Sequence, residues 1–392
     1  MLRLISLLLV LISASSLAAE NNKLHWQGYL SGGFADTNYD NFLVNGDGGS
    51  TMLYSGGLSA RWHFTPGISL TGQTIYQDTG DHNDNGLSLD YLQLDLSDNL
   101  LPNSEQTLSI GRFKSQIGLY NSTRDIPFTR PSIYLPQSIY SEGLRDFMLG
   151  MDGLKVKSDF FLDYGTLTAE AAVGKNVIDS KFNDNVLGPT YPGDWSSAIN
   201  YYFDLRYQID RWLLAANLTR SNVHYDSSNA IIESGGIHSL QSVFSLQYRE
   251  RWWEFVTEYG ERRMDLRGFV ITNGNNYFNN DRTMQSWYAQ LRFFPSNDWT
   301  LLARYDLHYN DKNDKNGDYL SRIPGGLFPT YFANSQDWTI GASWHPDDHW
   351  LIQLEHHWVD GASWLPPIGN PDPSVNTHAR WRLFAVQVSY RF

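Results

Sequence analysis

The residues best suited to chemistry are charged side chains gathered between positions 112 and 146. Cations and carboxylates lie close together in this segment, namely Arg112, Lys114, Arg124, Asp125, Arg130, Glu142, Arg145 and Asp146. Prolines and aromatic residues such as Pro127, Phe128, Tyr134 and Tyr140 are interspersed among them. Side chains of both signs at this density can select among charged solutes. For each residue taken singly, a structural salt bridge is the plainer interpretation.

Catalytic and metal-binding signatures are missing from the sequence. Neither Gly-x-Ser-x-Gly nor His-Glu-x-x-His occurs. His356 and His357 lie in a predicted strand, where adjacent side chains point to opposite faces, so they cannot chelate one metal ion. The acidic runs 81–86 and 311–318 could attract calcium, but they lack the closing Glu of a twelve-residue calcium loop. We therefore interpret both runs as solvated loops and expect neither an enzyme nor a cofactor.

The composition excludes several classes of protein. A net charge of −13 argues against general binding to nucleic acid, and the lack of cysteine excludes disulfides and thiolate metal sites. The mean hydropathy is −0.41, and no apolar stretch beyond the N-terminal one is long enough to span a membrane as a helix. Aromatic residues nevertheless make up 15% of the chain. A barrel with a wet interior, an apolar outside and two aromatic girdles accounts for this combination.

The N-terminal residues have the layout of a secretory signal peptide. Arg3 precedes the apolar run Leu4–Ile12, and small residues follow as far as Ala18 and Ala19. The run is too short for a spanning helix, which needs about 20 residues. A buried N-terminal helix is the alternative. We expect cleavage of residues 1–19, and a single domain over 20–392 because no linker or change in composition divides it.

Alternating hydrophobicity recurs along the whole chain. Between 299 and 309, for example, Trp, Leu, Ala and Tyr on one face alternate with mostly polar residues such as Thr, Arg, Asp and His on the other, which is the period of a half-exposed strand. We predict sixteen such strands, at 24–35, 51–64, 68–78, 87–97, 106–116, 147–159, 165–175, 197–209, 211–222, 238–249, 252–262, 282–294, 299–309, 335–345, 349–360 and 379–392.

The connections between these strands alternate in length. Short turns such as 65–67 and 346–348 alternate with long loops rich in Asn, Asp, Gly and Pro, such as 310–334. Unsatisfied backbone groups in hydrocarbon cost several kcal/mol each, so strands can span a membrane only in a closed sheet. We therefore predict an all-β fold, a transmembrane antiparallel β-barrel of about sixteen strands with an aqueous lumen. A soluble β-sandwich or β-helix is the alternative.

The alternation also predicts which charged side chains face the lumen. The inward residues are Arg61, Arg206, Arg292, Arg304, Asp204, Glu254, Glu258, Asp306 and Glu355. Arg112 and Lys114 join them if Gly111 marks a β-bulge.

The last strand alternates as far as the final residue, with Phe392, Tyr390, Val388, Val386 and Phe384 on one face. It resembles the C-terminal signature of bacterial outer-membrane barrels. The resemblance implies that Phe392, Tyr390 and Val388 form a signal for the barrel-assembly machinery. It also implies a location in the outer membrane, in contact with its lipid and lipopolysaccharide.

In strand number, loop alternation and ending, the chain resembles the sixteen-stranded porins. The segment 110–120 is also similar to a stretch of the phosphate-selective porin group, but the lysine-rich ladders that would support a phosphate role are missing. In porins the third loop folds into the lumen, which implies the same for loop three here, residues 117–146. A loop packed on the rim or at a subunit contact is the alternative.

The resemblance implies two sets of pore residues. The constriction would contain Arg61, Arg112, Lys114, Arg124, Asp125, Arg130, Glu142, Arg145 and Asp146. The pore wall would contain Arg206, Arg292, Arg304, Asp306, Glu254 and Glu258.

The implied function is passive diffusion of small hydrophilic solutes and ions. The alternative is a channel selective for anions or sugars, with a binding track at loop three, and a barrel enzyme or adhesin is a third hypothesis. The sequence leaves open the permeating solute, the sign of the ion preference, calcium binding by the surface loops and association into a homotrimer.

Overall fold

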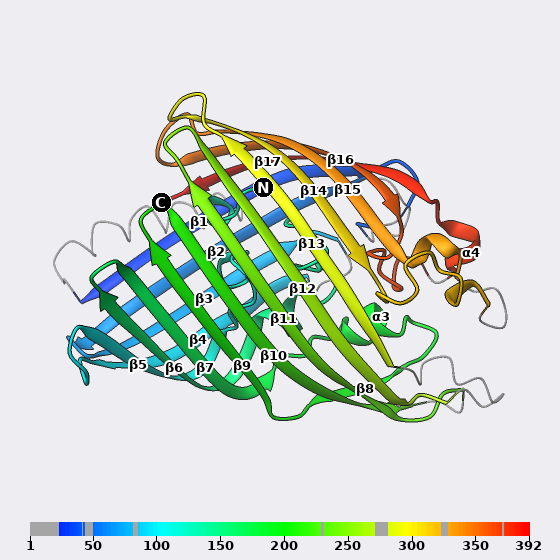
Figure 1. The fold of residues 1–392 in the computed structure, drawn as a ribbon, viewed down its shortest axis with the longest axis horizontal. Coiled ribbons are helices and arrows are strands. Elements are labelled where there is room, and N and C mark those ends of the chain that lie inside the picture. The colour runs from blue at the N-terminus through cyan, green and yellow to red at the C-terminus, as the bar shows by residue number, and fades with distance from the viewer. Residues whose placement is uncertain are drawn as a thin grey trace, which may run out of the picture.

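The computed structural model describes residues 23–40, 42–43, 50–80, 85–228, 231–270, 281–322, 328–370 and 372–392. Its strands form one closed antiparallel β-barrel (Figure 1). The strands in the first half are β1 (Leu24–Thr37), β2 (Ser50–Thr65), β3 (Ile68–Asp78), β4 (Gly86–Asp98), β5 (Ser104–Lys114), β6 (Gly150–Leu162), β7 (Gly165–Asn176), β8 (Gly193–Ser197) and β9 (Asn200–Ile209). Those in the second half are β10 (Trp212–Ser227), β11 (Gly235–Arg249), β12 (Trp253–Gly268), β13 (Asp281–Phe293), β14 (Trp299–Tyr309), β15 (Asn334–Trp344), β16 (Trp350–Gly361) and β17 (Arg380–Arg391). The expected signal peptide lies outside the described residues.

The barrel wall contains sixteen positions around its ring. β8 and β9 both pair with β10, one continuing the other, so the two segments fill one position between β7 and β10. This confirms the predicted strand number. The prediction at 197–209 covers β9 and only the last residue of β8.

The barrel closes where its first and last strands meet. β1 pairs with β2 on one side and with β17 on the other, and the two terminal strands run side by side in Figure 1. Phe392 completes this seam, because its N–H donates to the carbonyl oxygen of Gly28 and its carbonyl oxygen accepts from the N–H of Gly28, both at 3.0 Å. The closed ring leaves no open sheet edge, as a hydrocarbon environment requires.

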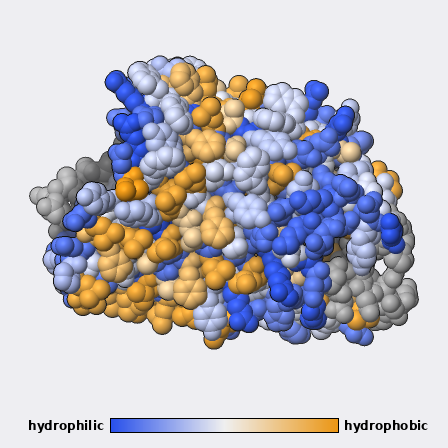
Figure 2. Space-filling view, viewed as in Figure 1, coloured by the Kyte–Doolittle hydropathy of each residue, from blue (hydrophilic) through white to orange (hydrophobic). Residues whose placement is uncertain are grey.

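Large apolar side chains lie on the outer face of the wall. Trp338, Ile340 and Phe244 are 60%, 52% and 57% exposed, respectively. Figure 2 shows apolar side chains concentrated toward the end with the short turns, and hydrophilic ones toward the end with the long loops. Within the described ranges, no helix has the length and apolar character to cross a membrane.

Gly111 does not mark a β-bulge, which is the condition under which Arg112 and Lys114 are predicted to face the lumen. The pairing of β5 with β4 and with β6 runs through Gly111 without a register shift. Gly111 instead allows a close approach, because a Cβ atom there would lie 2.4 Å from the carbonyl oxygen of Leu92 and its φ is +125°. Register shifts occur instead in the β3–β4 pairing, between Gln73 and Thr74, and in the β2–β3 pairing, between His63 and Thr65.

The long loops contain seven short helices in the described residues. These are η2 (Asn121–Thr123), η3 (Pro127–Thr129), α2 (Arg145–Leu149), α3 (Phe182–Val186), η4 (Leu320–Arg322), η5 (Thr330–Phe332) and α4 (Pro373–Asn376). Because α2 precedes β6, that strand begins at Gly150 and not at the predicted position 147. Loops at this end pack on one another, since Phe42, Phe332 and Leu365 form one buried apolar cluster with Ile133 and Tyr134 of loop three.

Candidate functional site

Loop three lies inside the barrel. The sequence predicts it at 117–146, and in the structure it occupies residues 115–149, because β5 ends at Lys114 and β6 begins at Gly150. It forms hydrogen bonds to inward-facing side chains of strands distributed around the ring. These wall residues are Gln77 on β3, Arg206 on β9, Glu258 on β12, Asp306 on β14 and Glu355 on β16. The loop therefore crosses the lumen, as predicted, and does not rest on the rim.

Two wall carboxylates hold the middle of loop three by its backbone. Glu355 accepts the N–H of Ile133 at 2.9 Å and the N–H of Tyr134 at 2.8 Å, one on each carboxylate oxygen. Asp306 accepts the N–H of Ser138 at 3.2 Å. Hydrogen bonds to an ionised acceptor are about twice as strong as neutral ones, so these contacts fix the path of the loop.

A third carboxylate holds two points of loop three, Leu119 and Tyr140. Glu258 is fully buried and accepts the N–H of Leu119 at 2.9 Å and the hydroxyl of Tyr140. On the wall side it accepts the hydroxyls of Tyr288, at 2.7 Å, and Ser245, at 2.5 Å. A buried carboxylate needs such donors to offset its desolvation.

The apolar face of loop three packs against the wall formed by β10 to β13. The cluster comprises Ile117, Leu119, Leu135, Ile139, Tyr140 and Met148 of the loop with Ala215, Val243, Val256 and Tyr288 of the wall. Gly260 makes room for Ile139, since a Cβ atom on Gly260 would lie 2.9 Å from Ile139 Cδ1. This side of the lumen is therefore filled with side chains.

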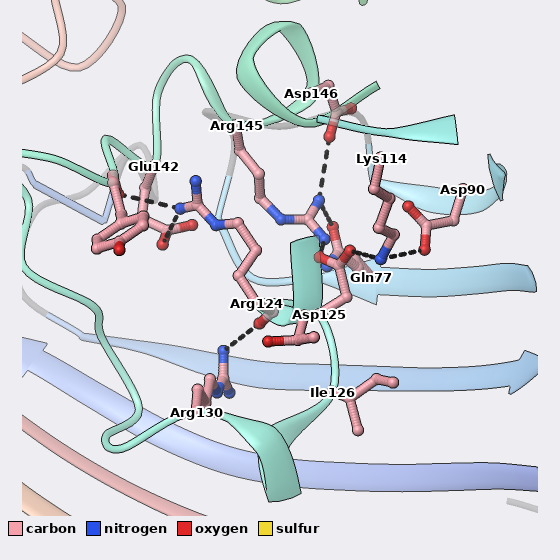
Figure 3. Close-up of polar contacts among 12 residues, drawn as sticks. Gln77, Asp90, Lys114, Arg124, Asp125, Ile126, Arg130, Glu142, Arg145 and Asp146 are labelled. Atoms are coloured by element: carbon pink, nitrogen blue, oxygen red, sulfur yellow. Dashed lines mark hydrogen bonds and ion pairs between the residues drawn. The ribbon is translucent and has the colours of Figure 1, made fainter. Parts of the chain in front are cut away.

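The opposite side of loop three borders a cavity of about 50 Å³. Its walls are the loop on one side and the inner faces of β2, β3 and β17 on the other. The charged residues of its lining are Arg124, Asp125, Arg130, Glu142 and Arg145 (Figure 3). The wall contributes polar side chains such as Gln77 and Gln387. The described part of the lumen thus combines a filled side with a narrow polar one.

Two of the lining arginines are paired with carboxylates of the same loop. Arg124 Nη2 lies 2.6 Å from Glu142 Oε1. Arg145 forms an ion pair with Asp125, and its Nη1 lies 3.1 Å from Asp146 Oδ1. Burial lowers the pKa of the Arg145 guanidinium from its ordinary value, and the nearby Asp146 acts in the opposite direction. The carboxylates therefore compensate part of the cost of burying these cations.

Lys114, at the end of β5, adjoins this group of charges. Its Nζ is 2.6 Å from Asp90 Oδ2 and 2.5 Å from Asp125 Oδ2. Only 9% of its side chain is exposed, so it supports Asp125 from the wall side rather than facing open water.

Arg112 does not lie in the lumen, contrary to its predicted place in the constriction. The register sets it opposite Leu92 on β4 and Asp152 on β6, on the outer face. It binds Asp152 through two hydrogen bonds, of 2.7 Å and 2.9 Å. Without a bulge at Gly111, the alternation of faces continues to Arg112 and turns this side chain outward. Lys114 has the same parity, but it is the last residue of β5, and its side chain reaches Asp125 of loop three.

Arg61 does face the lumen. Its Nε donates to the wall hydroxyl of Thr71 at 3.1 Å, and Thr71 in turn donates to Asp95 at 3.2 Å. These contacts place Arg61 in a network of the wall, and it is not among the residues that line the cavity beside loop three.

The predicted wall residues all face inward, but several are covered. Glu258, Asp306 and Arg304 are at most 1% exposed, because loop three lies over them. Arg304 donates to the carbonyl oxygen of Tyr134 at 3.1 Å, so it holds the loop and does not line a path for solutes. For these three residues the predicted role in the pore wall is corrected to one of holding the loop.

The remaining wall residues form local ion pairs. Arg292 Nη2 lies 2.7 Å from Glu254 Oε1, and Arg206 Nε lies 2.7 Å from Asp204 Oδ2. Arg206 also donates to the carbonyl oxygen of Gly118 at 2.6 Å, which ties the start of loop three to β9.

Sequence reasoning missed the neutral residues of the cavity lining, among them Ser55, Gln77, Thr79 and Gln387. Alternation does predict that Gln77 and Gln387 face inward. Alternation does not predict that the cavity lies against β2, β3 and β17, because the position of the cavity depends on which part of the wall loop three packs against. Within the described ranges, no group of three or more His, Cys, Asp or Glu side chains could hold a metal ion. The run 81–84 lies outside those ranges.

Comparison with known proteins supports the fold. No family model matches the sequence, and no curated protein matches it. A trimer form of OmpT, an outer-membrane protein of Vibrio cholerae, matches with a TM-score of 0.56 and 11% identity, over 94% of this chain and 99% of that one. An anion-selective porin from Comamonas acidovorans also matches with a TM-score of 0.56 and 11% identity, over 94% of this chain and 99% of that one. OmpF of Salmonella typhi matches with a TM-score of 0.57 and 11% identity, over 95% of this chain and 98% of that one. The chain therefore has the fold of the sixteen-stranded outer-membrane porins.

Proposed function

We propose that this protein is a porin of the bacterial outer membrane, a water-filled channel for passive diffusion of small hydrophilic solutes and ions. One observation carries the proposal. Loop three crosses the lumen, fills one side with apolar side chains and leaves on the other a narrow cavity lined by charged and polar groups. A constriction of this kind limits solute size and sets ion preference through its charged lining.

The surface of the barrel supports the membrane location. The wall has no open edge, and its outer face carries large exposed apolar residues such as Trp338 and Phe244. A soluble protein rarely exposes so much apolar surface. We further propose contacts with outer-membrane lipid and lipopolysaccharide, delivery by the barrel-assembly machinery, and a homotrimer, in keeping with the trimer form among the matched structures.

We propose no enzymatic activity. Ser286 Oγ and His308 Nδ1 lie 3.1 Å apart, a distance that a nucleophile and its base would have. The Ser286 hydroxyl, however, donates to the carbonyl oxygen of Ser138 at 2.9 Å, and loop three covers both residues. This pair therefore serves to hold the loop.

The alternative function is a channel selective for one class of solute. The three arginines of the cavity lining favour anions for that role. Saturable block of the conductance by a single class of solute would support selectivity, whereas conductance that scales with bulk mobility would support passive diffusion.

Planar-bilayer recording of the purified full chain tests the proposal. Folded protein should produce discrete, ohmic conductance steps, and a salt gradient should yield a reversal potential that reports the ion preference. Heat-denatured protein at the same concentration is the control. Absence of conductance steps from protein that runs as a folded, heat-modifiable barrel would refute the proposed function.

A further inference from the structure

The charges around the cavity are not fully paired. Three arginines and two carboxylates belong to its lining, and Asp146 and the Lys114–Asp90 pair adjoin it, so what matters is which cation lacks a direct partner. Arg124 pairs with Glu142, and Arg145 pairs with Asp125. Among the described residues, Arg130 has no carboxylate within ion-pair distance, although it lies in the same lining. Arg130 is therefore the cation that remains available to a solute.

The hydrogen bonds of Arg130 leave much of its guanidinium unused. Nη2 donates to Gln387 Oε1 at 2.8 Å. Nη1 donates weakly to the carbonyl oxygen of Arg124 at 3.4 Å (Figure 3). Nε has no acceptor. A guanidinium offers five N–H groups in a planar fork, so most of its donors lack a protein acceptor. A half-buried cation with unused donors is costly unless an anion or water takes them.

The neighbours of Arg130 hold the guanidinium in place. Gln387 extends from the inner face of β17, and the Arg124 carbonyl belongs to loop three. Arg130 thus bridges the loop and the wall across one margin of the cavity. A fork that is already oriented loses little conformational entropy when it binds a planar anion.

The size of the cavity limits what can bind there. A water molecule needs about 10–15 Å³ of such space, so the cavity of about 50 Å³ has room for a few non-hydrogen atoms. A carboxylate with its adjoining carbon fits this space. Larger groups such as a sugar ring would need the loop to move. The planar carboxylate also matches the two parallel N–H groups of an arginine fork.

We propose that Arg130 is a binding site for the carboxylate group of small organic anions that pass through the channel. The proposal rests on the proposed porin function and adds a class of solute to it. Binding takes place beside loop three, which crosses the lumen, so an occupied site reduces the passage of other ions. The Arg130 guanidinium binds the carboxylate, and Gln387 positions that guanidinium from the wall.

The test uses the purified full chain in planar bilayers, with chloride as the current carrier and succinate as the probe. Succinate should block the wild-type conductance in a saturable way. Arg130→Gln should raise the half-blocking concentration by about tenfold to a hundredfold, the value of one or two charge-assisted hydrogen bonds. Arg130→Lys keeps the charge but loses the fork, so its half-blocking concentration should lie between those of the wild type and Arg130→Gln.

Arg112→Gln is the matched control, because it removes the same charge from the outer face. Its half-blocking concentration should equal that of the wild type. Heat-modifiable mobility of every variant establishes that the barrel is folded.

The possible outcomes separate the two proposals. Failure of the wild type to conduct would refute the porin function. Conductance without saturable block by succinate, or with the same block in Arg130→Gln, would overturn the Arg130 site and leave the porin function standing. If sulfate blocks as strongly as succinate and depends equally on Arg130, the site binds anions in general and the assignment to carboxylates is wrong.

Discussion

Replacement of Glu355 by glutamine should loosen loop three inside an otherwise intact barrel. The carboxylate accepts the backbone N–H groups of Ile133 and Tyr134 at 2.9 Å and 2.8 Å, one on each oxygen. Glutamine has one acceptor oxygen, and its amide nitrogen would face the second N–H. Because the donors are backbone groups, no side chain of the loop can compensate for the change.

The magnitude follows from the two contacts. Loss of one hydrogen bond to a charged acceptor costs about 1.5–3 kcal/mol, and conversion of the other to a neutral bond costs about 1 kcal/mol. A total near 3 kcal/mol changes the ratio of held to detached conformations by about a hundredfold. The change should be local, because Glu258 and Asp306 still hold Leu119 and Ser138.

Single-channel recording is the assay. Glu355→Gln should show larger current fluctuations and a higher mean conductance than the wild type, and protease should cleave residues 131–136 faster. Glu254→Gln is the matched control, because Glu254 is an equally buried inward carboxylate whose hydrogen bonds go to the wall residues Gln247 and Arg292. If Glu355→Gln matches Glu254→Gln in noise, conductance and cleavage, wall carboxylates do not hold the loop.

Three other changes test separate parts of the structure. Phe392→Asp should prevent assembly into the membrane without affecting export, because it removes the aromatic ending that resembles an assembly signal and the ring that packs against Trp26 and Tyr390 at the seam; heat-modifiable barrel at normal outer-membrane levels would contradict this. Deletion of Phe128–Ile139 should raise single-channel conductance, because the segment crosses the lumen, and an unchanged value from a folded barrel would place it elsewhere. Arg112→Gln should leave the reversal potential in a salt gradient unchanged, because its ion pair with Asp152 lies on the outer face, and a shift toward cations would return it to the lumen.

The sequence alone determined the barrel and the two faces of its wall. The alternation along 299–309 predicts that Trp299 and Leu301 face outward and that Arg304 and Asp306 face inward, and each does so. This succeeds because the direction of a side chain on a strand is a local property with a period of two residues. The period also holds at Arg112, and the error there is the supposed bulge, since the sequence does not reveal whether Gly111 inserts a bulge or permits a close approach of β4.

Only the tertiary structure decided what the inward charges do. Glu355 and Ile133 are 222 residues apart in the chain, yet their hydrogen bond is one of those that place the loop across the lumen. That path covers Arg304 and Asp306 and leaves the cavity against β2, β3 and β17. It pairs Arg124 with Glu142, whereas Arg130 has no carboxylate partner among the residues that the structure describes. The effect of a charge depends on its burial and its partners, and in a closed barrel both are set by contacts between residues far apart in sequence.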